Sequence, residues 1–196
     1  MNTIVYIDGL NFYYVRVRYT PYRWLDFGAL CQRLLPGHNI ARINYYTCNV
    51  RGRPDDPLAP FRQQMYLRAL RTIPNLKVIS GHRAPDSSEK ETDVNLAVHV
   101  VRDGFNKSYD FPTIVTNDSD ITEAFRVVRK ELGYNIAWIC PAKHANSRLI
   151  PFASSIIPVR SHVLRACQFP DALLDAKGEI RKPSEWMNPK PRSHHP

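Results

Sequence analysis

The sequence of 196 residues contains few cysteines and no long apolar run. Cys31, Cys48, Cys140 and Cys167 are far apart, and none belongs to a CxxC or Cys/His pair that would suggest zinc. Three of them lie in apolar stretches, where we expect small buried side chains in a reducing compartment. No apolar run approaches the roughly 20 residues of a membrane span. The first ten residues lack the basic start and apolar core of a signal peptide. We therefore expect a cytoplasmic protein without a membrane partner.

Acidic residues are outnumbered by basic ones. The chain has 27 Lys and Arg against 18 Asp and Glu, which gives a formal net charge of +9. Its length and its 43% hydrophobic content fit one globular domain. The positive charge favours a polyanionic partner, because Lys and Arg displace counterions from nucleic-acid phosphates. The alternative is a solvated basic surface without a partner.

Strands and helices are predicted to alternate along the chain, without an internal repeat. Strand-like runs occur at residues 3–8, 41–48, 76–81, 113–117 and 135–140, with a weaker one at 155–159. One helix is expected after Asp26, one between Pro60 and Pro74, one from Asp93, and one from Ser119 or Asp120 to Gly133. This alternation predicts an α/β fold with a central parallel sheet that helices cover on both faces.

Two loops and a tail complete the predicted organisation. The loops are residues 49–57 and 82–90, of which the second is expected to border the functional site. We assign residues 1–165 to the α/β domain and residues 166–196 to a C-terminal proline-rich tail. From Lys177 onward the tail is so polar and rich in proline that we expect it to add no core element.

Four aspartates stand where this fold would gather them. Asp8 ends the first apolar run, Asp118 and Asp120 follow the fourth, and Asp93 opens a helical stretch. The carboxyl ends of parallel strands lie along one edge of the sheet, where ligands bind. Carboxylates gathered there would repel one another unless a cation lay between them, and hard oxygen ligands suit Mg²⁺ or Mn²⁺. A basic protein with such a pocket is most simply interpreted as a metal-dependent nuclease.

Each part of this pattern also has a structural interpretation. Asp120 and Glu123 fit a capping box, with Asp118 near the positive end of the helix dipole. A single aspartate after the first strand, such as Asp8, is sometimes a helix cap. In the third part, Lys90 stands three residues before Asp93. The two residues either form a surface ion pair, or Asp93 faces the metal while Lys90 contacts a phosphate.

Together these motifs resemble the NYN family of PIN-like nucleases, which includes the bacterial LabA-like proteins. The resemblance covers residues 3–157. It rests on Asp8 with Asn11, on Lys90 with Asp93, and on the Thr-Asn-Asp-Ser-Asp turn at residues 116–120, in matching order and spacing. The family implies a PIN-like three-layer α/β/α sandwich with a central parallel sheet. It also implies a ribonuclease activity that depends on Mg²⁺ or Mn²⁺.

Carried over by position, the resemblance assigns a set of site residues. The metal ligands and catalytic residues would be Asp8, Asp93, Asp118 and Asp120, and the residues lining the site would be Asn11, Thr116 and Ser119. Many members carry a second aspartate six residues after the helix aspartate, where this chain has His99. On an ideal helix, His99 lies off the face that carries Asp93. We therefore expect His99 to support the site and not to be a primary metal ligand.

The substrate-binding residues are expected among the basic side chains near the site. Arg51, Arg53, Arg83 and Lys90 are candidates to hold the backbone of single-stranded or structured RNA. After the first motif, Tyr13, Tyr14, Arg16 and Arg18 either stack bases and contact phosphates or form an ordinary amphipathic helix.

Three alternatives to an endoribonuclease stay open. One is a non-catalytic RNA-binding NYN module, and another is a DNA nuclease using the same pocket. A phosphatase of the haloacid dehalogenase type needs a second aspartate two residues after the first, where this chain has Leu10. The oligomeric state does not follow from the sequence.

Overall fold

The computed structural model describes residues 1–81 and 92–187. Its centre is a six-stranded sheet in the order β3-β2-β1-β4-β5-β6, in which every paired strand is parallel. The strands are β1 (Asn2–Asp8), β2 (Asn39–Thr47), β3 (Leu76–Ser80), β4 (Phe111–Val115), β5 (Ala137–Cys140) and β6 (Ser155–Pro158). All six predicted strands are confirmed, each within two residues at either end.

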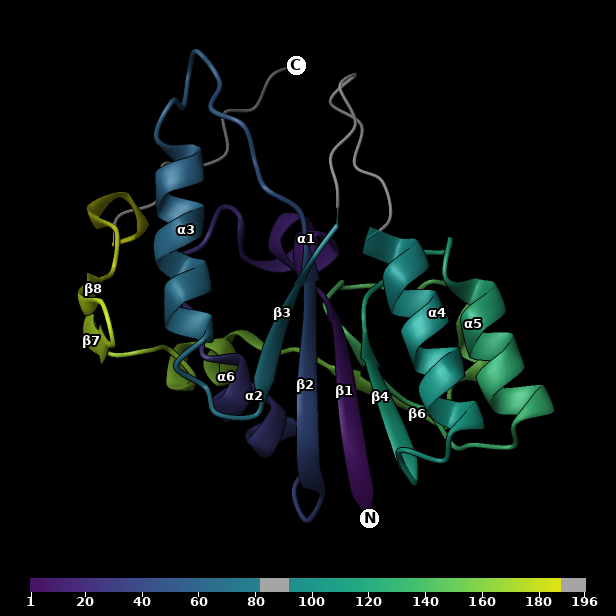
Figure 1. Cartoon of the computed structure of the whole chain (residues 1–196). Helices are drawn as coiled ribbons and strands as arrows, with labels where there is room; N and C mark the ends of the chain where they lie inside the picture. Colours follow the sequence, from purple (N-terminus) through teal and green to yellow (C-terminus); the bar gives the residue numbers. More distant parts are fainter. Residues whose placement is uncertain (82–91, 188–196) are drawn as a thin grey trace.

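Helices connect the strands and form the outer layers (Figure 1). They are α1 (Gly9–Phe12), α2 (Phe27–Leu34), α3 (Ala59–Leu70), α4 (Thr92–Phe105), α5 (Thr122–Arg126) and α6 (Ser161–Ala166), and π-helical turns extend α1 over Tyr13–Val17 and α5 over Val127–Glu131. The predicted cap of α2 is confirmed, because the carboxylate of Asp26 accepts a hydrogen bond of 3.0 Å from the backbone N–H of Ala29.

The two faces of the sheet have separate cores, which makes the fold a three-layer sandwich. Successive strand side chains point to opposite faces. In β1, Val5 and Ile7 therefore pack with α2, α3 and α6, whereas Ile4 and Tyr6 pack with α4 and α5. Both sets are buried, as expected for a parallel sheet covered on each side. The predicted α/β/α architecture is confirmed.

The described part of the C-terminal tail corrects one expectation. It forms a hairpin of β7 (Ala172–Asp175) and β8 (Gly178–Arg181), followed by a short 3-10 turn, Ser184–Trp186. Ile180 is fully buried and Trp186 is 6% exposed, and both belong to the core on the α3 side. The hairpin is also fixed to α3 by a bidentate ion pair at 2.7 and 2.9 Å between Arg68 and Asp175. The tail therefore does contribute core side chains, because two apolar anchors are sufficient in an otherwise polar segment.

Other features of the described residues agree with the sequence. All four cysteines are buried and free. Across residues 1–81 and 92–187, no helix has both the length and the apolar composition needed to cross a bilayer. The expected loop at residues 82–90 lies outside the described residues.

Candidate acidic active site

The site lies where the order of the strands changes direction. From β1 the chain proceeds through β2 and β3 to one edge, then crosses through α4 to β4, which pairs with the other side of β1. The loops after β1 and β4 therefore leave in different directions, and such a switch point creates a crevice at the carboxyl ends of the strands. Asp8 ends β1, and Thr116 to Asp120 follow β4.

Asp8 is the buried centre of the site. Its side chain is 3% exposed, and both carboxylate oxygens accept hydrogen bonds. The backbone N–H of Asn11 donates to Oδ1 at 2.9 Å, and the hydroxyl of Thr116 donates to Oδ2 at 3.0 Å. Asp8 thus caps α1, as the structural interpretation expected, and it is also joined to the loop after β4.

The pKa of Asp8 is raised from 3.8 to about 7. Burial is the largest cause, and the negative charges of Asp93 and Asp118 raise the pKa further. The hydrogen bonds from Asn11 and Thr116 oppose this shift only in part. The three carboxylates from β1, α4 and the loop after β4 are therefore near enough to influence one another electrostatically.

The turn after β4 is ordered by its own side chains. The hydroxyl of Thr116 accepts a hydrogen bond of 3.1 Å from the N–H of Asp118, whose Oδ1 accepts one of 3.0 Å from the N–H of Asp120. Helix α5 begins only at Thr122, and its N-cap residue Ile121 makes no side-chain cap. The structural interpretation of Asp120 and Glu123 as a capping box is therefore wrong. Asp120 is exposed, and Asp118 and Ser119 are half-buried.

Two asparagines connect the turns of the site. The side-chain oxygen of Asn11 accepts a hydrogen bond of 2.9 Å from the N–H of Asn117. The side-chain oxygen of Asn117 in turn accepts a bond of 3.0 Å from the N–H of Asn146. Asn11 was predicted as a lining residue, and the structure gives it a bridging role between α1 and the loop after β4. Asn117 and Asn146 were not predicted, although Asn117 lies inside the motif of residues 116–120.

The donor chemistry of the site fits a hard divalent cation. No described Lys, Arg or His forms an ion pair with Asp8, Asp118 or Asp120. Buried carboxylates without a cationic partner are the donor set that Mg²⁺ or Mn²⁺ prefers. Within residues 1–81 and 92–187, however, no three His, Cys, Asp or Glu side chains lie close enough to hold one ion. Three carboxylates of the described residues could hold one ion only if they drew closer together.

The comparisons with known proteins identify the family. The model of the NYN domain matches residues 2–160, which is most of the chain. The chain belongs to the NYN domain family. This membership implies a nuclease-like, PIN-like fold and suggests a nucleic-acid substrate.

Two further similarities accompany the match to the NYN domain. A curated relative is 31% identical over 238 residues, covering 95% of this chain and 75% of the relative. It is named 6-hydroxy-3-succinoylpyridine 3-monooxygenase HspA, from Pseudomonas putida (strain DSM 28022 / S16). Among solved structures, VPA0982 from Vibrio parahaemolyticus RIMD 2210633, a protein of unknown function, has a TM-score of 0.62 at 15% identity. That likeness covers 82% of this chain and 93% of the other, and it concerns the fold alone.

Two of the four basic residues expected to bind substrate lie in the described part of the chain. Arg51 and Arg53 follow β2 and line a cavity between α1 and α3. Arg53 Nε also lies 3.7 Å from a carboxylate oxygen of Asp55. Arg83 and Lys90 fall outside the described residues.

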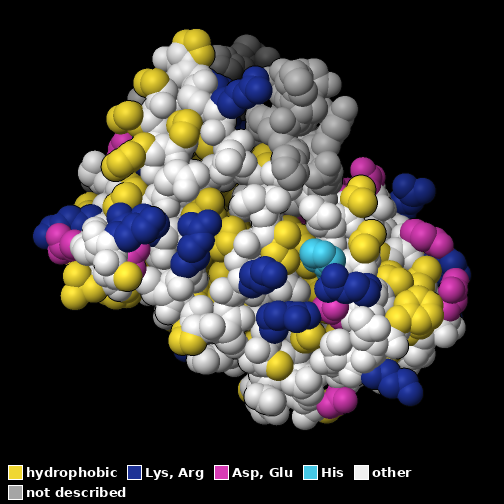
Figure 2. All heavy atoms as spheres, in the orientation of Figure 1, with side chains coloured by type: hydrophobic (Ala, Val, Ile, Leu, Met, Phe, Trp, Pro, Cys, Tyr) yellow, Lys and Arg dark blue, Asp and Glu magenta, His cyan; other side chains and the backbone are white. Residues whose placement is uncertain are grey.

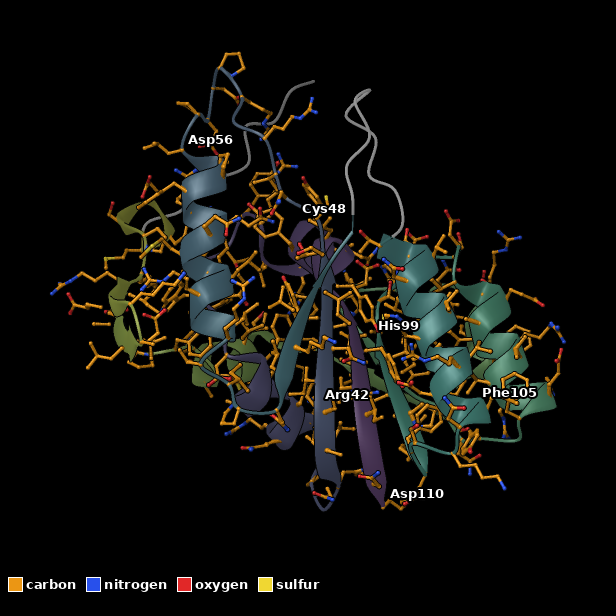
Figure 3. The ribbon with its side chains drawn as sticks, in the orientation of Figure 1. Arg42, Cys48, Asp56, His99, Phe105 and Asp110 are labelled. Carbon is orange, nitrogen blue, oxygen red and sulfur yellow. The ribbon has the colours of Figure 1, made fainter. Side chains whose placement is uncertain are left out.

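His99 of α4 contacts the sheet. Its Nδ1 shares a hydrogen bond of 3.0 Å with the hydroxyl of Tyr46, which belongs to β2. Burial, followed by the positive charge of Arg102, lowers the pKa of His99. In Figure 3, His99 lies between α4 and the sheet, on the same side as Arg42. This position fits the expected supporting role.

Next to His99 is a buried acid that the sequence analysis did not single out. Asp103 accepts a hydrogen bond of 2.8 Å from the hydroxyl of Tyr6, and it pairs with Arg42 and Arg102. Leu96, Val100 and Asp103 are all buried at helical spacing, so an acid on the apolar side of α4 was the signal that marked it. Three cations, Arg42, Lys77 and Arg102, act on His99 and define a basic patch on this face. Figure 2 shows Lys and Arg side chains grouped there.

Proposed function

We propose that this NYN domain is a divalent-metal-dependent endoribonuclease whose acidic site is formed by Asp8, Asp93, Asp118 and Asp120. The observation that carries the proposal is Asp8, a buried carboxylate at the switch point. It has no cationic partner among residues 1–81 and 92–187, and Asp93 and Asp118 act on it. A crowded acidic pocket in a protein of net charge +9 is difficult to explain as a stabilising feature.

The surrounding residues position the acids for this chemistry. Bound Mg²⁺ or Mn²⁺ would supply the Lewis acidity that activates water and neutralises charge at a phosphate. Thr116 orients Asp8 through its hydroxyl and at the same time accepts from the N–H of Asp118. Asn11 joins α1 to Asn117, which keeps the two acidic turns together. One of the carboxylates accepts the proton that the attacking water loses.

The substrate side of the proposal rests on charge. The basic patch of Arg42, Lys77 and Arg102 lies on the α4 face of the sheet and offers phosphate contacts. RNA is proposed as the substrate because the family is RNA-related. The assay must distinguish cleavage of RNA from cleavage of DNA in the same pocket.

The test compares cleavage of single-stranded RNA, structured RNA and DNA in Mg²⁺, Mn²⁺ or EDTA. Asp118→Asn should abolish most of the cleavage without loss of folding. Asp110→Asn is the matched control, because Asp110 is an exposed carboxylate beyond the opposite ends of the strands, where it accepts a bond of 2.8 Å from the N–H of Asn2. Asp110 is marked at that end in Figure 3. RNA binding without cleavage in any metal would instead identify a non-catalytic module.

A second candidate function follows from the curated relative. Its printed name describes oxygenation of a succinoyl-substituted hydroxypyridine, and it is 31% identical over 95% of this chain. A related activity here would consume O₂ and a two-electron donor while hydroxylating a heteroaromatic ring. Incubation with 6-hydroxy-3-succinoylpyridine, O₂ and reduced nicotinamide or flavin donors tests it, with substrate consumption followed by chromatography. Unchanged substrate under all donors would exclude this candidate for that compound.

A further inference from the structure

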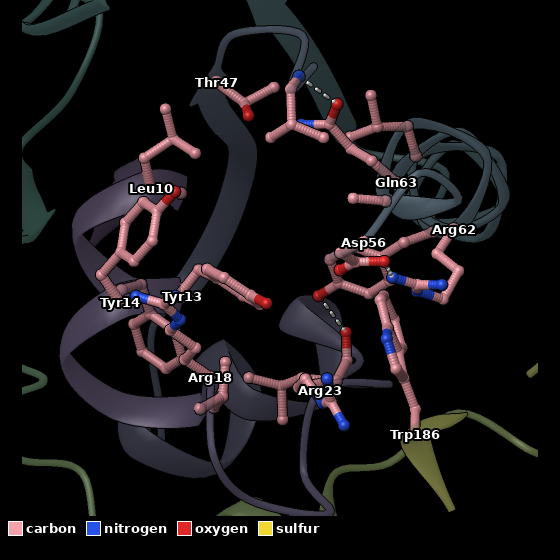
Figure 4. A pocket seen from close by; sticks show the side chains of 18 of the residues that line it. Leu10, Tyr13, Tyr14, Arg18, Arg23, Thr47, Asp56, Arg62, Gln63 and Trp186 are labelled. Carbon is pink, nitrogen blue, oxygen red and sulfur yellow. Dashed lines mark hydrogen bonds and ion pairs between the residues drawn. The ribbon is translucent and has the colours of Figure 1, made fainter. Parts of the chain in front are cut away.

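A cavity of about 490 Å³ is lined by Gly9 and Leu10 of α1 but not by Asp8, Thr116 or Asp118 of the acidic site. It is enclosed by α1 and its π-helical turn, the loop after β2, α3 and Trp186 (Figure 4). We call it the α1–α3 cavity. Its volume is within the range of small-molecule and cofactor sites, roughly 300–1,000 Å³.

Aromatic rings form much of the wall of the α1–α3 cavity. Tyr13 and Tyr14 lie on the α1 side with ring centroids 5.2 Å apart. Tyr66 and Trp186 lie on the α3 side with centroids 5.8 Å apart. In Figure 4 the hydroxyl of Tyr13 points into the open centre. Aromatic rings on two sides of a cavity favour a flat ring between them, because contacts between aromatic rings, including stacking, are energetically favourable.

The charge around the cavity is positive. Arg18 and Arg23 both line it, and in the described part of the chain neither forms an ion pair with a carboxylate. Arg18 instead places its guanidinium 5.2 Å from the ring centroid of Tyr14, and Arg23 lies 5.5 Å from that of Trp186. By contrast, Arg62 is neutralised by Asp56 and by Glu185.

The guanidinium of Arg23 interacts with Tyr13 and with the charge of Asp56, but not all of its N–H groups have acceptors. Its Nε is buried without a hydrogen-bond partner, while one Nη donates a bond of 2.9 Å to the backbone oxygen of Glu185. Burial is also the main cause that lowers the pKa of Arg23. A buried guanidinium nitrogen without an acceptor is unfavourable, and an anionic group in the cavity would compensate the charge of this guanidinium.

We propose that the α1–α3 cavity binds a planar heteroaromatic ring that carries an anionic group, with the ring between the tyrosines and Trp186 and the anion at Arg18 and Arg23. The ligand would lie beside the acidic site, since Gly9 and Leu10 line the cavity and directly follow Asp8. Gly9 permits this arrangement, because a Cβ there would come within 2.4 Å of the Tyr45 ring. The binding itself requires no metal and does not rest on the nuclease activity.

Two sources can supply this chemistry, a nucleotide of a bound RNA or a free heteroaromatic acid. Isothermal titration of the full chain in EDTA distinguishes the two sources by comparing the affinities of different probes. It is carried out with wild type and with Asp118→Asn. The probes are uridine 5′-monophosphate, adenosine 5′-monophosphate and pyridine-3-carboxylate, with ribose 5-phosphate as an anion that lacks a ring. We expect at least one ring-bearing probe to bind about tenfold more tightly than ribose 5-phosphate, or better.

Variants locate the binding. Arg23→Gln and Arg18→Gln should each raise the dissociation constant at least about tenfold, as expected for loss of a hydrogen bond to a charged group. Arg71→Gln is the matched control, because Arg71 is exposed at the other end of α3. If Arg23→Gln melts early through lost contact with Trp186, Arg18→Gln carries the test, since its guanidinium rests on the exposed Tyr14 and Tyr19.

Each outcome decides the proposal. Preference for a nucleoside monophosphate identifies an RNA nucleotide as the ligand, and preference for pyridine-3-carboxylate identifies a small acid; either result, or binding of both, supports it. Failure of every ring-bearing probe to bind, equal binding of ribose 5-phosphate, or unchanged affinity in the folded arginine variants would overturn it. Asp118→Asn is expected to bind the probes as tightly as wild type does. A failure of the proposed nuclease activity would therefore not change the outcome of the binding measurement.

Discussion

Replacement of Asp8 by asparagine should stabilise the metal-free protein at high pH. The pKa of Asp8 is raised by burial from 3.8 to about 7. The folded state therefore binds more protons than the unfolded state between about pH 4 and pH 7, and stability is lost as the pH rises through that window. The difference between the two pKa values corresponds to about 4 kcal/mol, fully expressed above pH 7.

The net gain for Asp8→Asn is smaller than this limit. The carboxylate accepts bonds from Asn11 and Thr116, and an amide oxygen replaces a charged acceptor only in part. We therefore expect the variant to exceed wild type by about 1–3 kcal/mol at pH 8 and to match it within about 1 kcal/mol at pH 4. Added Mg²⁺ or Mn²⁺ should reverse the order at pH 8, because only wild type gains from binding the ion.

Urea unfolding in EDTA at pH 4, 6 and 8 measures this difference, with Asp110→Asn as the exposed carboxylate control. The control should lack the stabilisation at pH 8 that is expected for Asp8→Asn, because Asp110 is exposed. If Asp8→Asn were less stable than wild type at every pH, the main role of Asp8 would be to cap α1. If the stability difference between Asp8→Asn and wild type did not depend on pH, the pKa of Asp8 would not be raised. The argument that its buried charge favours a bound cation would then fail.

The remaining predictions concern substrate binding, the site and the tail. Affinity for single-stranded RNA should fall steeply with salt, and Lys77→Gln should reduce the slope of log affinity against log salt by about 0.7; a flat salt dependence would remove the argument from basic charge. Thr116→Val should lower activity about 10–100-fold, measured as metal-dependent cleavage, because the hydroxyl orients Asp8. His99→Ala should cause only a modest loss in a Mg²⁺ titration of cleavage, and His99→Asp no gain, since His99 bonds to Tyr46; a large loss for His99→Ala would reveal a ligand. Trp186→Ala should destabilise the fold by about 3–5 kcal/mol in urea unfolding, and a change below about 1 kcal/mol would mean that the tail is merely a surface strap.

The strands could be read from the sequence because their signal is local. Each is a short apolar run that ends at a polar or turn residue, and parallel pairing buries both faces. The helix ends were predicted less well. Helix α5 begins two to three residues later than expected, because the N–H of Asp120 bonds to Asp118 and the chain turns before the helix starts. A local capping pattern does not show whether a residue such as Asp120 starts the helix or belongs to a separate turn before it.

The tail and the buried acid of α4 show where sequence reasoning failed. Proline and charge dominate the composition after Lys177, so the two anchors Ile180 and Trp186 were overlooked. The burial of Trp186 depends on the rings of Trp24 and Tyr66, far away in sequence, which no local pattern reveals. Asp103 of α4 was overlooked for a similar reason, since its partners Tyr6 and Arg42 come from the strands β1 and β2.

The positions of the strand ends could be predicted from the sequence, but the geometry of the acidic site depends on details that only packing decides. Strand order places the turns after β1 and β4 side by side, and that much follows from the alternation of elements. The distance between carboxylates depends on the hydrogen bonds of Asn11 and Asn117, which fix the two turns. In residues 1–81 and 92–187 no group of three such ligands is found.

The position of α1 connects the two proposed sites. The helix begins with Asp8 in the acidic site, and its next residues line the α1–α3 cavity. A ring held by Tyr13 and Trp186 would therefore lie close to the carboxylates whether it belonged to an RNA nucleotide or to a free acid. The same edge of the sheet can present a substrate to either kind of chemistry, because a fold supplies a place for a site and does not determine its reaction. The arginines of the cavity and the aspartates of the switch point make separable contributions, and binding in EDTA measured beside cleavage in Mg²⁺ assigns each.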